Sequence, residues 1–185
     1  EKYGLQLVSW NSGKLHNAIP RDGRAVFAIP IDKKEAVRAD WNVFTAKVED
    51  EFHVTEKDME FSLESTEAGL VLPKTVSNNI IRAIQAVDNG VFSMCQDEEL
   101  AWLVETSSNI ASIKSTDTEI KVVASQRSNV MSNLDNMCAT VKATFQLAGA
   151  EVVQGEGYPA WKMNPNSKLT KITVDTYKEL FGKEP

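Results

Sequence analysis

The sequence contains few of the residues from which metal centres and disulfide frameworks are built. Its 185 residues include only two histidines, His16 and His53, and two cysteines, Cys95 and Cys138. A catalytic zinc ion usually takes three or more His, Cys or carboxylate ligands, and two unpatterned cysteines make no disulfide framework. We therefore expect no metal site, no cofactor and no disulfide within this chain, and a reducing, cytoplasmic setting.

Long apolar runs and an excess of positive charge are missing as well. No segment reaches the roughly 18 apolar residues that a bilayer span requires, and no basic region followed by an apolar stretch opens the chain. The 26 acidic side chains outnumber the 20 basic ones, so the net charge of −6 provides no field that would attract phosphate backbones or anionic lipid. We expect neither nucleic acid nor a membrane as a partner.

The motifs of the common enzyme classes are also absent. There is no Gly-rich phosphate loop, no Gly-x-Ser-x-Gly elbow, no His-Glu-x-x-His and no Cys-x-x-Cys. We therefore expect no catalytic residue in this chain. It begins without a methionine and stops at Pro185 directly after a helix-like run, as expected for a piece of a longer protein.

What is present is the hydrophobic patterning of a folded domain, because 42% of the residues are hydrophobic and 25% are charged. In the first part of the chain, strands are predicted at 5–8 and 24–31, followed by a helix from an N-cap at Asp32 to Phe52. Apolar and polar residues alternate over 59–64, which predicts a third strand with one wet face.

The same order returns later in the chain. Strands are predicted at 107–115 and 119–127, then a helix over 130–148 that Gly149 ends, then a strand at 151–154. Between the two parts lie a predicted helix at 76–87 and a segment at 97–103 that fits either a helical turn or a covered loop. A last amphipathic helix is predicted at 169–181.

This repeated strand–strand–helix–strand order predicts an α+β fold, with antiparallel sheets, helices packed on one face and two ferredoxin-like half-units in tandem. The half-units span about 1–66 and 105–157, and the helical segment 67–104 joins them. Residues 158–185 change in character, with a Pro- and Asn-rich loop before the last helix. The predicted domain therefore covers 1–157.

Two polar residues stand out as candidates for binding. Asn17 offers both a donor and an acceptor, in a loop that Pro20 stiffens by restricting Ile19 to extended geometry, although a simple Asn turn explains the pattern equally well. Arg127 ends a strand that is otherwise apolar, and its planar guanidinium suits a carboxylate, the alternative being a salt bridge at the rim of the sheet.

Three segments resemble a known enzyme family in their order and spacing. They are Trp10-Asn-Ser-Gly-Lys-Leu-His-Asn-Ala-Ile-Pro-Arg21, Val104-Glu-Thr-Ser-Ser-Asn109, and Gly157-Tyr-Pro-Ala-Trp161 with Asn166-Ser167 after it. Together they resemble the metallopeptidase family of carboxypeptidase G and carnosinase, in particular the bacterial aminoacyl-histidine dipeptidases. The resemblance spans essentially the whole chain.

Members of that family have a di-zinc catalytic domain interrupted by an inserted lid or dimerisation domain, and this chain resembles the insert. The resemblance implies that the two zinc ions, their ligands and the glutamate general base belong to the remainder of the parent protein. It also implies as partners a dipeptide substrate, the chain's own catalytic domain and a second copy in a homodimer. Residues 158–185 would then be the return loop and the first helix of the catalytic domain.

The resemblance also implies roles for the two candidates. Asn17 matches the asparagine of the family's Asn-x-Ile-Pro motif, which approaches the substrate near its carbonyl. Relatives with one lid unit bind the substrate carboxylate with an arginine at the end of the next strand, where this chain has Ile29-Pro-Ile31. The equivalent strand end in the second half-unit is Arg127, which receives that role. His16 stands where the dipeptidases more often have arginine, and it receives none.

Two other functions fit the same residues. The chain could be a stand-alone ferredoxin-like regulatory module that binds a small carboxylate through Asn17 and Arg127, or an adaptor that mediates dimerisation alone. A parent gene encoding His-x-Asp upstream and a late His-Ala-Gly-like segment downstream would distinguish the lid domain from the regulatory module. The adaptor alone predicts that Arg127→Ala leaves every activity of the full-length protein unchanged.

Overall fold

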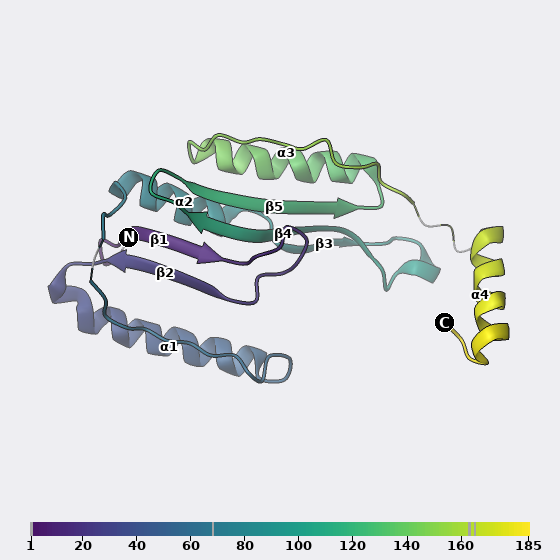
Figure 1. Cartoon of the computed structure of the whole chain (residues 1–185), viewed down its shortest axis with the longest axis horizontal. Coiled ribbons are helices and arrows are strands. Elements are labelled where there is room, and N and C mark those ends of the chain that lie inside the picture. The colour runs from purple at the N-terminus through teal and green to yellow at the C-terminus, as the bar shows by residue number, and fades with distance from the viewer. Residues whose placement is uncertain (1, 68, 163, 165) are drawn as a thin grey trace.

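A computed structural model describes residues 2–67, 69–162, 164 and 166–185. Five antiparallel strands form one sheet, and helices lie along it and beyond its end (Figure 1). The strands are β1 (Gln6–Ser12), β2 (Gly23–Ala28), β3 (Gly90–Met94), β4 (Val104–Ser115) and β5 (Ile120–Ser128). The helices are α1 (Lys34–Phe52), α2 (Lys74–Ala86), α3 (Met131–Leu147) and α4 (Lys168–Phe181), with short 3-10 turns η1 (Ile31–Lys33) and η2 (Glu98–Leu100).

The long strand β4 is the centre of the sheet. One of its edges pairs with β5 over nearly its full length, from Thr106↔Ser128 to Ser115↔Ile120. Two strands pair with the opposite edge of β4: β3 pairs with the first part of β4, and β1 pairs with the last part at Ser12↔Ile113. β2 pairs in turn with the outer edge of β1. Elements from the two ends of the chain therefore meet on β4.

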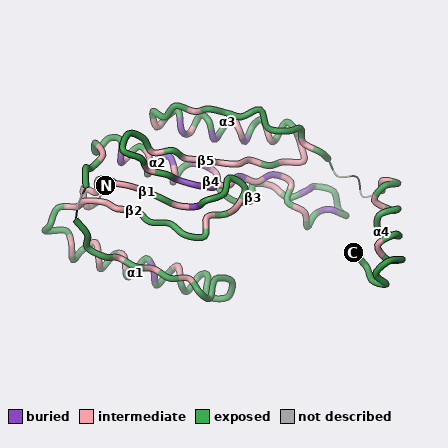
Figure 2. The backbone as a smooth tube through the Cα atoms, in the orientation of Figure 1, coloured by how far each residue is buried: buried purple, intermediate pink, exposed green. Residues whose placement is uncertain are grey.

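The core lies between one face of this sheet and the helices α2 and α3. In α3, Met137, Val141 and Phe145 recur every four residues and are buried, as expected for one stripe of a helix. They pack with Ala83 and Val87 from the end of α2, over partly buried apolar side chains of β4 and β5. Figure 2 shows this burial along β4, α2 and α3, whereas α1 and α4 are mostly exposed.

The structure confirms the α+β class, the antiparallel pairing and most of the predicted elements. Gly149 follows α3 with a φ of +83°, as a glycine that ends a helix should. The two halves are joined more closely than a tandem arrangement requires, because the contact of β1 with β4 merges them into a single sheet.

Two predicted strands are absent from the described sheet. Residues 59–64 alternate in exposure as expected, but Phe61 packs edge-on against Trp41 of α1, with ring centroids 6.2 Å apart. An extended segment lying on a helix buries every second side chain just as an edge strand does. Residues 151–154 likewise run without strand pairing after α3.

Two further details differ from expectation. β3 was not predicted, because its apolar residues Val91 and Phe92 are both largely exposed and give no alternation to read. Asp32 does not cap α1: it lies in η1, and the helix begins only at Lys34 without a side-chain cap.

The last helix, α4, buries no residue, and it lies beyond the end of the sheet in Figure 1. Its apolar stripe, including Leu169, Ile172, Leu180 and Phe181, stays exposed, so it does not fold back onto the sheet within this chain. No helix in the described ranges has the length and apolarity to cross a membrane.

Candidate functional site

The candidate site begins with the loop between β1 and β2, which carries Asn17. The loop leaves β1 at Gly13, whose φ of +64° lies in the left-handed region. Its base is closed by two hydrogen bonds to the carbonyl of Asp22, one from the Gly13 amide at 3.2 Å and one from the Ser12 hydroxyl at 3.0 Å. Asn17 itself is exposed at the tip.

The central strand β4 holds this loop at successive points. At the end of β4, the Ser115 hydroxyl accepts a hydrogen bond from the Trp10 amide at 2.7 Å and donates one to the Trp10 carbonyl at 3.0 Å. Gly13 then lies directly on Ala111, so closely that a Cβ on the glycine would sit 2.1 Å from the Ala111 oxygen. Further along, the Asn109 side-chain amide donates to the Ala18 carbonyl at 2.9 Å.

The same stretch of β4 leads to Arg127. In the β4–β5 register Asn109 lies opposite Ser125, and Ser107 lies opposite Arg127. Residues two apart on a strand share a face, so these two rungs lie on the side of the sheet opposite Ile110, which packs against the core. Asn109 thus connects the loop of Asn17 to the sheet face that carries Arg127, two residue pairs away from Arg127.

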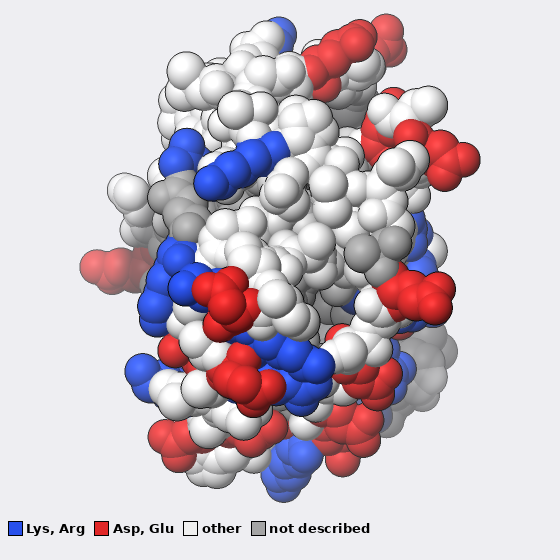
Figure 3. Space-filling view, turned by 90° about the vertical axis from the view of Figure 1, so that its left-hand side faces the viewer, with Lys and Arg blue, Asp and Glu red and all other residues white. Residues whose placement is uncertain are grey.

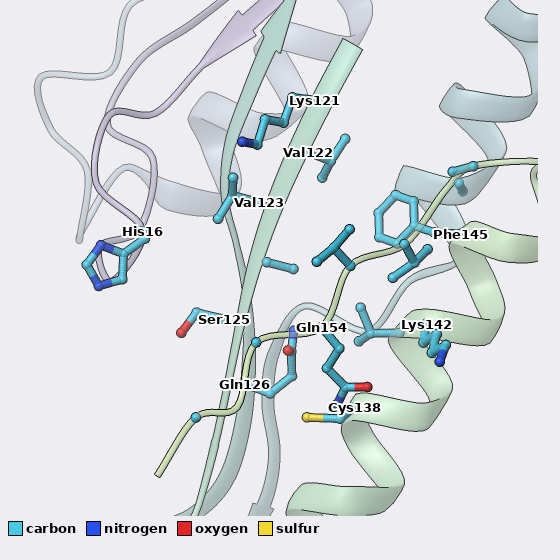
Figure 4. Close-up of a pocket in the computed structure, with 18 of the residues that line it drawn as sticks. His16, Lys121, Val122, Val123, Ser125, Gln126, Cys138, Lys142, Phe145 and Gln154 are labelled. Carbon is cyan, nitrogen blue, oxygen red and sulfur yellow. The ribbon is translucent and has the colours of Figure 1, made fainter. Parts of the chain in front are cut away.

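A broad hollow of about 1990 Å³ includes both Asn17 and Arg127 in its long lining, along with His16, Ser107 and Ser125. The hollow extends around β5. In Figure 4, Lys121, Val123 and Ser125 point to the side of His16, whereas Val122 and Gln126 point toward α3. Only the polar side holds the predicted binding residues. His16, to which the sequence assigned no role, lies there too.

On the α3 side, the segment after α3 is attached to that helix through Cys138 and Gln154 (Figure 4). Burial raises the pKa of the Cys138 thiol, and the charge of Asp135 adds to the rise, while the hydrogen bond from Gln154 acts in the opposite direction. A thiol in this setting is predominantly protonated near neutral pH and packs as a small apolar group.

The polar side has the chemistry of a binding surface. An exposed guanidinium and an exposed carboxamide can together hold a carboxylate and an amide carbonyl, the two polar groups of a peptide terminus.

On the face shown in Figure 3, acidic and basic side chains are interspersed over the lower half, on the side of α1. Throughout the described ranges, no three His, Cys, Asp or Glu side chains gather as a possible metal site.

The comparisons with known proteins bear on the whole chain. No protein-family model matches it. It is 29% identical over 188 aligned residues to the cytosol non-specific dipeptidase of Escherichia coli strain K12, a match that covers 100% of this chain and 38% of the relative. The crystal structure of the aminoacylhistidine dipeptidase from Vibrio alginolyticus matches with a TM-score of 0.85 and 28% identity, over 100% of this chain and 37% of that one.

From end to end, the chain resembles part of an aminoacyl-histidine dipeptidase. It spans little more than a third of the dipeptidases that it matches. The fold described above therefore matches the fold of a part of the Vibrio alginolyticus dipeptidase. This confirms the resemblance that the three sequence segments indicated.

Sequence reasoning missed two residues of the site, Asn109 and Ser115. Each bonds to main-chain atoms far away in the sequence, Asn109 across 91 residues and Ser115 across 105. One signal was available: β4 begins with the polar run Thr106-Ser-Ser-Asn109, which is unusual in the central strand of a sheet. That run also belongs to one of the three segments in which the sequence resembles the aminoacyl-histidine dipeptidases.

Proposed function

We propose that this chain is the lid and dimerisation domain of a cytoplasmic di-zinc dipeptidase that hydrolyses Xaa-His and other dipeptides. The observation that carries the proposal is the match of the entire chain to about three-eighths of two dipeptidases, at a TM-score of 0.85 for the solved one. The presence of both Asn17 and Arg127 in the lining of one broad hollow is consistent with it. The chain itself would be inactive in hydrolysis.

In this proposal the chain contributes binding and orientation of the substrate. Arg127 would hold the terminal carboxylate through its two parallel N–H donors, and the Asn17 carboxamide would donate to the carbonyl of the scissile bond. Closure of the domain over the substrate would exclude water from the reacting groups. The two zinc ions would be held by the remainder of the parent protein and would supply an activated water.

The proposed homodimer has support in exposed apolar side chains on and near β3. Val91, Phe92 and Trp102 are 61%, 57% and 71% exposed. Large apolar side chains that stay exposed are available for contact with another protein. The exposed stripe of α4 would in turn pack against the catalytic domain of the same chain.

The experiment that tests the proposed function removes Arg127 from the full-length parent. We expect Arg127→Ala to lower kcat/KM for dipeptides by roughly 2–4 kcal/mol of transition-state stabilisation, because a carboxylate loses its charged partner. The loss should be much smaller for dipeptide amides, which lack that carboxylate. Arg24→Ala, which removes an exposed arginine from β2, is the matched control.

Two results would contradict the proposal. Equal losses on dipeptides and dipeptide amides would show that Arg127 does not bind the terminal carboxylate. A full-length parent that hydrolyses no dipeptide would remove the proposed function altogether, and a binding assay of this chain with small carboxylates would then test the regulatory-module alternative.

A further inference from the structure

The first part of β4, from Val104 to Asn109, is one of the three segments that resemble the dipeptidases, and it has no role in the proposed function. Its last residue makes the contact that matters for the site. The Nδ2 atom of the partly buried Asn109 donates a hydrogen bond of 2.9 Å to the carbonyl of Ala18, the residue directly after Asn17. Asn109 therefore touches the loop but stands one residue away from the binding group.

The position of this bond determines what it can do. Gly13 fixes the start of the loop against Ala111, and the bond from Asn109 holds Ala18, four residues beyond Lys14. The exposed stretch with Asn17 lies between these two attachments. Because β4 is the central strand, paired on both edges, its side chains provide a rigid reference for the loop.

We propose that Asn109 is a positioning residue, whose side-chain amide holds the Ala18 carbonyl and so fixes Asn17 over the sheet face that carries Arg127. The Asn109–Ser125 pair and the Ser107–Arg127 pair are two residues apart on the same face of the sheet, so one strand sets the separation of the two binding groups. The consequence for catalysis rests on the proposed function, whereas the restraint on the loop is a property of this chain alone.

An asparagine suits this task for a chemical reason. Its Nδ2 group donates, while an aspartate of the same shape can only accept and would place a negative charge against the Ala18 oxygen. Asn109→Asp therefore removes the hydrogen bond and adds repulsion without creating a cavity.

The chain offers a matched control for this substitution. Asn79 of α2 also donates from Nδ2 to a main-chain carbonyl, that of Ala148, at 3.2 Å. Asn79→Asp changes the same chemistry at the end of α3, away from the β1–β2 loop. Comparing the two variants separates an effect on the loop from the general cost of losing a side-chain bond.

The experiment uses the full-length parent and two readouts. The first is hydrogen–deuterium exchange of the peptide that covers 13–22. We expect faster exchange there in Asn109→Asp and unchanged exchange in Asn79→Asp. The second is kcat/KM for a dipeptide, which we expect Asn109→Asp to lower roughly ten- to a hundredfold, since a misplacement of about 1 Å has such an effect.

A double-mutant cycle with Asn17→Ala distinguishes positioning from a purely structural role. If Asn109 acts through Asn17, the loss caused by Asn109→Asp should largely disappear once Asn17 is already alanine. The proposal is overturned if exchange of 13–22 is unchanged in Asn109→Asp, or if the activity loss is equally large in both backgrounds. Should the wild-type parent hydrolyse no dipeptide, the proposed function fails, and the exchange result alone decides whether Asn109 restrains the loop.

Discussion

The close approach of Gly13 to β4 allows a prediction that uses three glycines of this chain as a graded series. Gly13→Ala would combine two penalties. The φ of +64° at this position is one that a residue with a Cβ adopts only with strain, and the new Cβ would lie 2.1 Å from the Ala111 oxygen. The clash is with backbone of the central strand, which cannot turn away as a flexible side chain would.

The size of the effect follows from these two penalties. Holding a non-glycine residue in the left-handed region costs about 1–2 kcal/mol. The new Cβ would also push β1 away from β4. Such a displacement resembles overpacking of a core, which costs about 1–3 kcal/mol. We therefore expect Gly13→Ala to lower the free energy of unfolding by about 2–5 kcal/mol. At roughly 2–4 °C for each kcal/mol in a chain of this length, the midpoint temperature should fall by roughly 4–20 °C.

Two other glycines provide the controls. Gly149 has a φ of +83° with no atom within 4 Å of a built Cβ, so Gly149→Ala should show the conformational penalty alone, about 1–2 kcal/mol. Gly155 has neither a positive φ nor a close neighbour, so Gly155→Ala should be nearly neutral. Urea unfolding of the four proteins, followed by far-UV circular dichroism, measures the series.

The refuting result is specific. If Gly13→Ala destabilises the chain no more than Gly149→Ala does, the contact with Ala111 is not the rigid attachment described above. A lower unfolding free energy for Gly155→Ala than for Gly149→Ala would also contradict the reasoning.

Two further predictions concern hydrogen bonding and pH. Ser115→Ala removes both hydroxyl hydrogen bonds to the Trp10 main chain, so it should lower the free energy of unfolding in urea by about 1–3 kcal/mol. The control Ser62→Ala, at an exposed serine, should leave that free energy almost unchanged. Equal losses in the two variants would contradict the role of Ser115. The raised pKa of Cys138 keeps its thiol protonated in the folded chain above about pH 9, where the unfolded chain releases the proton, so stability should fall as pH rises through that range. Cys138→Ala should lose less stability than wild type between pH 7 and pH 10, and identical losses would show that Cys138 is not responsible.

The repeating patterns of the sequence predicted the helical and inner-strand elements well. The period of four in α3, its terminal glycine and the apolar run of β5 are local properties, and each corresponds to the structure observed. The alternation over 59–64 was also read correctly as burial of every second side chain. The element that covers these side chains was predicted wrongly, because a pattern of burial does not say whether the covering surface is a strand or, as here, the helix α1.

The sequence by itself determined the α+β class, the resemblance to the dipeptidases and the two candidate binding residues, because these depend on residue type and spacing along the chain. Whether those candidates share a hollow was decided only by the tertiary structure. Asn17 and Arg127 are far apart in the sequence. They line one hollow because β1 lies beside β4 and because Asn109 bonds to Ala18 across 91 residues. Contacts of that range arise from which edges pair and how closely backbones approach, and neither leaves a periodic signal in the sequence.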